Sequence, residues 1–145
     1  MIVEVSGAAI PRFSRREIGA FTGKVLLALR KAGVISDISI AFVDDASMQQ
    51  LNKRYRRRNR TTDVLTFPAD ESYADPGATK RPLGDIVISV DQARRQAADE
   101  RHSLATEVRY LILHGVLHAL GYDHETDHGE MNALELKVRE KVGLG

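Results

Sequence analysis

Apolar and polar residues alternate with two different periods along this chain, which indicates strands in some segments and helices in others. Val3 and Val5 alternate with polar neighbours, whereas Ile18, Val25 and Leu29 recur at helical spacing. Runs rich in β-branched and aromatic residues predict the remaining strands. The expected strands are 3–6, 35–43, 63–68 and 84–90. The expected helices are 14–33, 44–56, 91–101, 103–120 and 127–142.

The order of these elements predicts one domain over residues 1–145. Strands interleaved with helices indicate an α/β or α+β sheet of about four strands with helices packed on it. Residues 69–83 have the Pro, Gly and Asp content of a loop. The helix at 103–120 is apolar nearly all round from Leu111 onward, so we expect it to lie in the core.

The composition mainly excludes certain kinds of site and of cellular location. The chain has no cysteine, which rules out disulfides, thiolate metal sites and cysteine nucleophiles. A bound metal must therefore use His, Asp or Glu. No window approaches the roughly 18 apolar residues of a membrane helix, and the first residues lack the pattern of a secretory signal. We therefore expect a cytoplasmic protein that does not enter a membrane.

Charge is distributed unevenly, although the net charge is only +1. Residues 1–60 contain twelve Lys and Arg against five Asp and Glu, and six of these cations lie within residues 53–60. Such a dense run suits a polyanionic partner, because clustered cations attract phosphates and release their counterions. It would also suit a solvated helix end, and charge alone does not separate the two interpretations.

Three histidines have the spacing of metal ligands. His114 and His118 are four residues apart, so on a helix they lie one turn above each other. Gly121 suits a left-handed residue that ends the helix and turns His124 back toward the same ion. Three imidazoles would leave one open position on a tetrahedral zinc ion, where a bound water would have its pKa lowered toward about 7.

The histidines also admit other interpretations. They could be core or capping residues, but each buried ring nitrogen would then need a hydrogen-bond partner. His128 is the alternative third ligand, and its place in an acidic stretch beyond the turn favours a surface position. His102 stands among charged residues and is also expected at the surface.

Gly115 occupies the position of the glutamate that serves as general base in zinc peptidases with the His-Glu-x-x-His motif. A glycine inside a helix costs about 1 kcal/mol relative to alanine, so we expect another part of the protein to approach this backbone closely. Asp123 could orient a metal ligand from behind, or it could be a turn residue.

With these segments in view, the chain resembles the YbeY family of bacterial endoribonucleases, also called rRNA maturation factors. The histidine segment is the most specific part of the match. Ala119, where the family usually has leucine, and the density of arginine in 54–60 are departures from the family pattern. The matching segments are LNKRYR (51–56), TDVLTFP (62–68), LGDIVIS (83–89), HGVLHALGYDH (114–124) and the helix with Met131 and Glu135.

The resemblance implies an α+β zincin-like domain with a mixed sheet of about four strands. It implies a zinc-dependent, single-strand-specific endoribonuclease in 16S rRNA 3′-end maturation, ribosome biogenesis and quality control. His114, His118 and His124 would bind about one Zn²⁺ per chain, and Arg56 would be the functional arginine. The implied partners are single-stranded RNA, small-subunit rRNA, the ribosome, a ribosomal protein and a ribosome-associated GTPase.

Two further functions remain open from the residues. One is a metal-dependent hydrolase of peptide or amide substrates, which Gly115 and the basic run disfavour. The other is a non-catalytic ribosome-assembly protein in which the metal only braces the fold.

Overall fold

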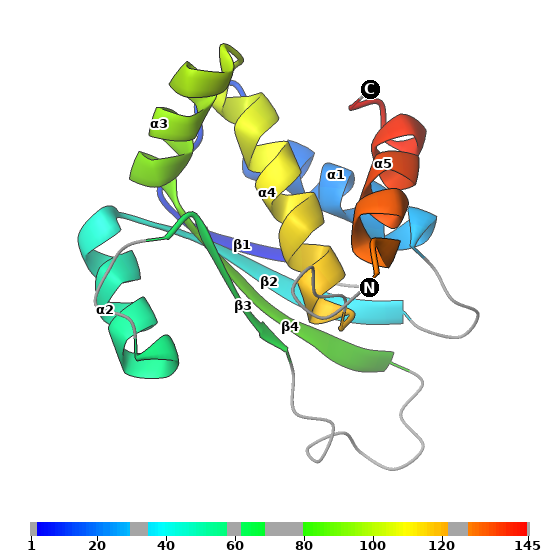
Figure 1. Cartoon of the computed structure of the whole chain (residues 1–145), viewed down its shortest axis with the longest axis horizontal. Coiled ribbons are helices and arrows are strands. Elements are labelled where there is room, and N and C mark those ends of the chain that lie inside the picture. The colour runs from blue at the N-terminus through cyan, green and yellow to red at the C-terminus, as the bar shows by residue number, and fades with distance from the viewer. Residues whose placement is uncertain (1–2, 30–34, 58–61, 69–79, 122–127, 145) are drawn as a thin grey trace.

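The computed structural model describes residues 3–29, 35–57, 62–68, 80–121 and 128–144, which form one four-stranded sheet with helices packed on it (Figure 1). The strand order is β1-β2-β4-β3, in which β1, β2 and β4 are parallel and β3 is antiparallel to β4. This mixed sheet with helices confirms the predicted α+β class. The strands are β1 (Val3–Gly7), β2 (Ile35–Val43), β3 (Val64–Pro68) and β4 (Lys80–Ser89).

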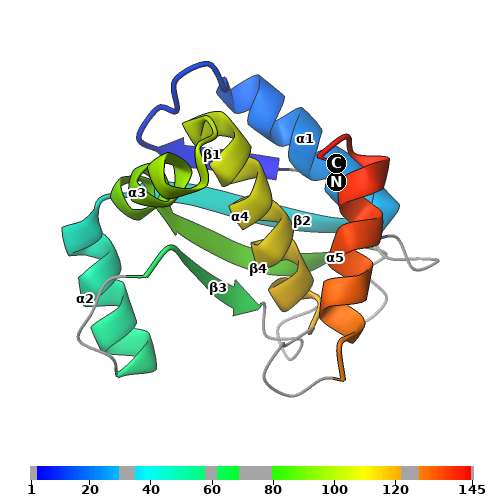
Figure 2. The same cartoon turned by 45° about the horizontal axis from the view of Figure 1, so that its top comes forward.

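The helices divide between the two faces of the sheet (Figures 1 and 2). On one face lie α1 (Arg15–Ala28), α3 (Val90–Glu100), α4 (Leu104–Ala119) and α5 (Glu130–Lys141). On the other face lies α2 (Asp45–Arg56). No helix in the part of the chain that the structure describes is long and apolar enough to cross a bilayer.

The alternation along β4 produces two cores of unequal size. Ile86 and Ile88 point into the large core beneath α4, whereas Val87 points to the opposite face. There Val87 joins Leu65 of β3 and Met48 of α2 in a small cluster. The helix α2 is therefore attached through a narrow apolar contact, while α4 is enclosed in the main core.

Gly115 brings α4 into close contact with the sheet, as its place inside the helix predicts. A Cβ atom at this position would lie 2.8 Å from Cγ2 of Ile86. The Thr66 hydroxyl also donates a hydrogen bond to the Gly115 carbonyl at 3.4 Å. The glycine is therefore needed to seat α4 on β3 and β4.

Several predicted boundaries were wrong by a few residues. The strand β4 begins at Lys80, where a loop was expected, because Lys80 pairs with Ile35 of β2 and extends the ladder. The helix α1 begins after the predicted cap Ser14, whose hydroxyl accepts from the Glu17 N–H, but it ends at Ala28 before reaching residue 33. The last helix begins at Glu130 instead of 127.

Candidate functional site

His114 and His118 lie together in the C-terminal half of α4. Their ring centroids are 5.0 Å apart and the ring planes make an angle of 67°. Both residues are partly exposed, although the adjacent Leu113 and Leu117 are fully buried. The helix therefore presents two imidazole rings on one partly open side, as their four-residue spacing predicts.

The turn after α4 has the predicted glycine geometry. Gly121 has a φ of +97°, a conformation that is costly for residues with a side chain. Its N–H donates a hydrogen bond to the His118 carbonyl at 2.9 Å and so fixes the turn behind that residue. Asp123 and His124 lie outside the described residues, so the position of the third ligand stays a prediction.

Glu135 approaches the histidine pair from α5. Its Oε1 atom lies 3.5 Å from Nδ1 of His114 and accepts a hydrogen bond from Arg139 at 3.2 Å. Only 8% of the Glu135 side chain is exposed. Hydrogen bonding to His114 lowers the pKa of Glu135, against the raising effect of burial, and the Arg139 charge also lowers it. A buried, ionised carboxylate therefore stands behind one histidine ring.

Glu135 has no role among the residues that the sequence singles out. A usable signal was its spacing from Met131, because residues four apart share one helix face and Met131 is fully buried. That spacing places Glu135 on the inner face of α5. It could not identify the partner, because His114 is far away in the sequence.

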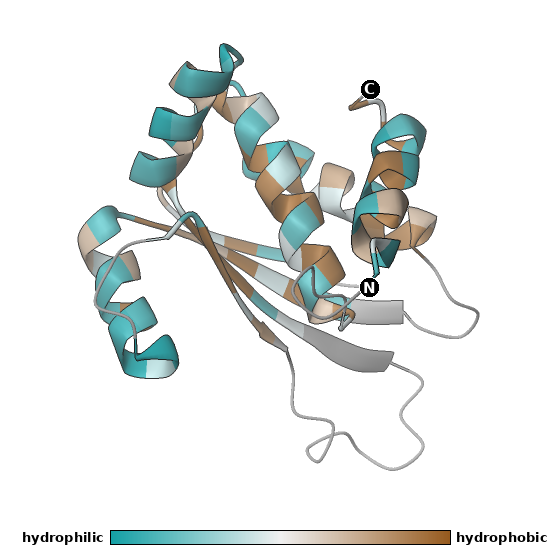
Figure 3. Ribbon diagram, viewed as in Figure 1, coloured by the Kyte–Doolittle hydropathy of each residue, from teal (hydrophilic) through white to brown (hydrophobic). Residues whose placement is uncertain are grey.

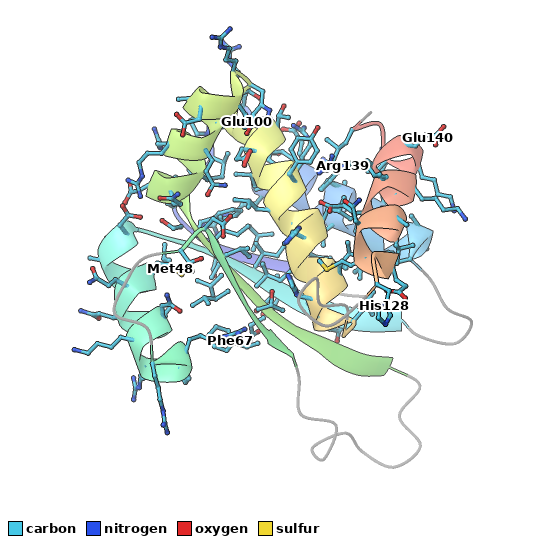
Figure 4. All side chains as sticks on the ribbon, in the orientation of Figure 1. Met48, Phe67, Glu100, His128, Arg139 and Glu140 are labelled. Carbon is cyan, nitrogen blue, oxygen red and sulfur yellow. The ribbon has the colours of Figure 1, made fainter. Side chains whose placement is uncertain are left out.

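Arg139 anchors α5 to the histidine helix from the other side of Glu135. Its guanidinium carbon lies 4.5 Å from the ring centroid of Tyr110 on α4. The Tyr110 hydroxyl in turn donates to the carbonyl of Leu144 at 3.2 Å. Figure 4 shows Arg139 in the space between α5 and α4. These contacts fix the position of Glu135 relative to His114.

The residues present fit a metal such as zinc. Imidazole nitrogens are good zinc donors, and a carboxylate on the second ring nitrogen leaves the first available for a metal. Within the described ranges, no three His, Asp or Glu side chains are grouped to hold an ion. A third ligand from the protein would come from another segment, and His124 is the predicted one.

The two remaining histidines differ in their surroundings. His128 is exposed near the start of α5, as expected (Figure 4). His102 was also expected at the surface, and 25% of its side chain is exposed. Its Nε2 lies 2.8 Å from a carboxylate oxygen of the buried Glu107, and its ring is only partly exposed. The buried carboxylate needs a partner, which explains the inward position of this histidine.

The basic run begins on α2, and its described part is exposed. We call Lys53, Arg54, Arg56 and Arg57 the basic surface. Arg56 is the last residue of α2, and Arg57 ends the helix in a left-handed conformation. The residues 58–60 lie outside the described part of the chain.

The basic surface and the histidine pair belong to opposite faces of the sheet. Both α2 and α4 run toward the end of β3 that carries Phe67, as Figures 1 and 2 show. The strand β3 forms the edge of the described sheet between the two regions. The position of Arg56 relative to the third predicted ligand stays a prediction.

Comparisons with known proteins agree with the motifs. The family model described as Endoribonuclease YbeY matches residues 12–143. A protein of that name from Nautilia profundicola is 47% identical over 108 residues, covering 74% of this chain and 73% of its own length. Another from Desulfitobacterium hafniense is 41% identical over 140 residues, covering 88% and 89% of the two chains.

A solved structure has the same fold. The solution structure of TM1509 from Thermotoga maritima superimposes with a TM-score of 0.65, and 97% of this chain and 89% of that one are covered. Its sequence identity is 24%, so this likeness concerns the fold alone. The family match and the relatives carry the assignment, and on their basis the chain belongs to the YbeY endoribonuclease family.

Proposed function

We propose that this protein is a zinc-dependent endoribonuclease that cuts single-stranded RNA in 16S rRNA 3′-end maturation, ribosome biogenesis and ribosome quality control. The observation that carries the proposal is the paired His114 and His118, backed by the buried Glu135, in a member of an endoribonuclease family. The basic surface supports a polyanionic substrate.

His114, His118 and His124 would hold the metal. When bound, zinc would polarise a phosphoryl oxygen and lower the pKa of a water molecule in its open position. The Glu135 carboxylate lies next to Nδ1 of His114, where it would keep a proton on that nitrogen and leave Nε2 as the metal-binding atom. The buried packing of α4 would hold the helix in place when the histidine nitrogens bind the metal.

The environment of Gly115 argues against a peptidase. In a zinc peptidase with the His-Glu-x-x-His motif, this position holds the carboxylate that takes a proton from water. Here even a Cβ atom would collide with Ile86 in the core. A glutamate at this point of α4 would face the sheet, so the fold has no place for that base.

RNA cleavage can proceed without such a glutamate. The nucleophile can be the substrate's own 2′-hydroxyl or an activated water, and a cation can stabilise the charge on the phosphorus oxygens. We assign this second task to Arg56, which is exposed at the end of α2. Its planar guanidinium can hold two phosphate oxygens at once.

The setting of this activity follows from the same proposal. The substrate would be small-subunit rRNA in the cytoplasm, reached on the ribosome. A ribosomal protein and a ribosome-associated GTPase would be the protein partners. The alternatives are a metal-dependent peptide or amide hydrolase and a non-catalytic assembly protein with a structural metal.

One assay separates these functions. Metal-free and zinc-reconstituted protein would be incubated with unstructured RNA, casein and small amides. We expect zinc-restored cleavage of RNA alone. Cleavage of casein or amides would establish the hydrolase alternative, and a zinc-stabilised fold without any cleavage would establish the structural one.

A further inference from the structure

The basic surface contains an exposed aromatic ring that a merely solvated helix end does not need. Tyr55 lies between Arg54 and Arg56, and 56% of it is exposed. In the described part of the chain, the other large apolar residues this exposed are leucines. The guanidinium carbon of Arg54 lies 5.7 Å from the ring centroid, so the ring and the cations form one continuous surface.

The ring of Tyr55 is supported by a second aromatic ring on the sheet. It packs against Phe67 of β3 with a centroid separation of 5.2 Å and an interplanar angle of 74°. Phe67 is itself packed against the small cluster with Met48, Leu65 and Val87. We call Tyr55 and Phe67 the aromatic platform. Its support by the sheet means that little rotational freedom would be lost when a ligand binds to it.

The aromatic platform includes a residue of β3, and the opposite face of this strand packs against α4. Phe67 points to the α2 face of β3, while the preceding Thr66 points to the other face and binds the backbone of Gly115. One edge strand therefore separates the platform from the histidine helix. A flexible chain that crosses this edge would contact both.

We propose that Tyr55 stacks against an unpaired base of the RNA substrate, while the surrounding cations bind its phosphates. This inference rests on the proposed function. Single-stranded RNA is recognised by aromatic side chains that stack on exposed bases next to basic residues that follow the backbone. The bases of a duplex are already stacked on one another, so the platform would favour unpaired RNA. Charge complementarity fits any polyanion, but an acidic protein offers no bases to stack on the aromatic platform, which favours single-stranded RNA as the occupant.

The absence of tryptophan from the sequence allows a direct test. A Tyr55→Trp variant would carry a single indole at the platform. Addition of a single-stranded 2′-O-methyl oligonucleotide, which cannot be cut through its 2′ oxygen, should quench its fluorescence through stacking. Poly-L-glutamate and duplex RNA carry charge without unpaired bases and should leave the emission nearly unchanged.

A matched indole elsewhere controls for nonspecific quenching. Leu136 on α5 is 55% exposed, almost as much as Tyr55, and lies outside the basic surface. Leu136→Trp should give no quenching by the same oligonucleotide. Equal quenching of both variants, or quenching of Tyr55→Trp by poly-L-glutamate to the same extent, would overturn the proposal.

Affinity measurements give a second, independent readout. Tyr55→Phe should bind the oligonucleotide within about twofold of the wild type, and Tyr55→Leu about tenfold to a hundredfold more weakly. The salt dependence should be the same for all three, because no phosphate contact is lost. An oligonucleotide with abasic sites should bind the wild type and Tyr55→Leu equally. Unchanged affinity of Tyr55→Leu for the normal oligonucleotide would refute stacking.

These measurements need no cleavage, so they can fail separately from the proposed function. Quenching and weakened binding in a protein that cuts no RNA would support the platform and refute the nuclease proposal. RNA cleavage by a Tyr55→Leu variant with full affinity would support the nuclease proposal and refute the platform. Because Tyr55 is exposed, thermal unfolding should show that each variant is folded.

Discussion

Helices α2 and α4 cover opposite faces of one sheet, yet they are held there in different ways. The helix α4 contains many apolar residues among polar ones, whereas α2 is mostly hydrophilic, as Figure 3 shows. In α4 most residues from Leu111 to Leu117 are buried, whereas Met48 and Asn52 are the buried residues of α2. The histidines proposed to bind a metal therefore lie on the enclosed helix. The cations and Tyr55, which would meet a flexible polymer, lie on the open one.

This difference separates two requirements of a nuclease. Metal ligands must be held in place before the metal arrives, because each ligand that moves costs conformational entropy on binding. Phosphate contacts tolerate motion, since their attraction acts over several ångströms and depends little on orientation. The tight packing of Gly115 on Ile86 and the anchoring of α5 by Arg139 supply the first property.

The largest expected effect concerns a proposed metal ligand on α4. His118→Ala should reduce metal content from about one ion per chain to a small fraction of that, and abolish metal-dependent RNA cleavage. Elemental analysis of the purified protein measures the first effect. His128→Ala is the control and should retain its metal, because His128 is exposed beyond the predicted site. Full metal content in His118→Ala would show that α4 does not hold the ion.

Arg56 tests whether the open helix contributes to chemistry as well as to binding. Arg56→Ala should lower the single-turnover cleavage rate at saturating protein by about 100-fold to 1000-fold, with metal content unchanged. Lysine should restore little, because a point charge cannot bridge two phosphate oxygens. Lys53→Ala, on the same helix, should weaken RNA binding without changing this rate. If both variants behave alike, Arg56 is only one more phosphate-binding cation.

The sequence predicted α4 better than the contacts around it. Its apolar periodicity, the histidine spacing and the helix-ending Gly121 are local patterns, and all three agree with the structure. The start of β4 was missed because Lys80 becomes a strand residue only by pairing with Ile35. The approach of Glu135 to His114 also joins distant segments, and no local pattern encodes such a contact.

Glu135 sharpens the comparison, because it connects the enclosed helix to α5. Glu135→Gln should weaken metal affinity by about tenfold to a hundredfold, since an amide holds the His114 ring less strongly than a carboxylate. Competition with a chelator of known affinity measures this loss, and nitrogen NMR shifts of the His114 ring report its tautomer in the metal-free protein. Glu140→Gln, exposed on the same helix, should change neither quantity.

A purely structural role for Glu135 would give a different result. Glu135→Gln would then lower the melting temperature but leave the His114 tautomer and the metal affinity of the folded protein unchanged. Arg139→Met supplies a second comparison, because it removes the other partner of Glu135 and leaves the carboxylate next to His114.

Alanine substitutions at two helical glycines compare a tightly packed position with an open one, and neither removes a proposed site side chain. Gly115→Ala should destabilise the fold by about 1–2 kcal/mol, because overpacking against Ile86 exceeds the gain in helix propensity. Gly19→Ala in α1 should stabilise it by about 0.5–1 kcal/mol, because alanine restricts the unfolded chain and, among the described residues beyond the local helix, no atom lies within 4 Å of the new methyl group. Urea unfolding measures both. A neutral Gly115→Ala would show that α4 can move away from the sheet at little cost.

The smallest expected effect concerns the N-terminal caps of α2 and α4. Asp44 caps α2 by accepting a hydrogen bond from the Ser47 N–H at 2.8 Å, whereas α4 is capped by the neutral Ser103. This bond lowers the pKa of Asp44 below its ordinary value. A carboxylate with a lowered pKa in the folded state stabilises the fold above its unfolded pKa, and this contribution is lost as the pH falls through the folded value.

Acid should therefore weaken the start of α2 and spare the start of α4. Asn can accept the same capping bond without a charge, so Asp44→Asn removes the acid-sensitive part of the cap alone. The melting temperatures of the wild type and this variant should differ slightly at neutral pH and converge below about pH 4. Ser103→Ala should lower the melting temperature by the same amount at both pH values. A constant difference between the wild type and Asp44→Asn would show that the charge of Asp44 contributes nothing, and that both helices begin with equivalent caps.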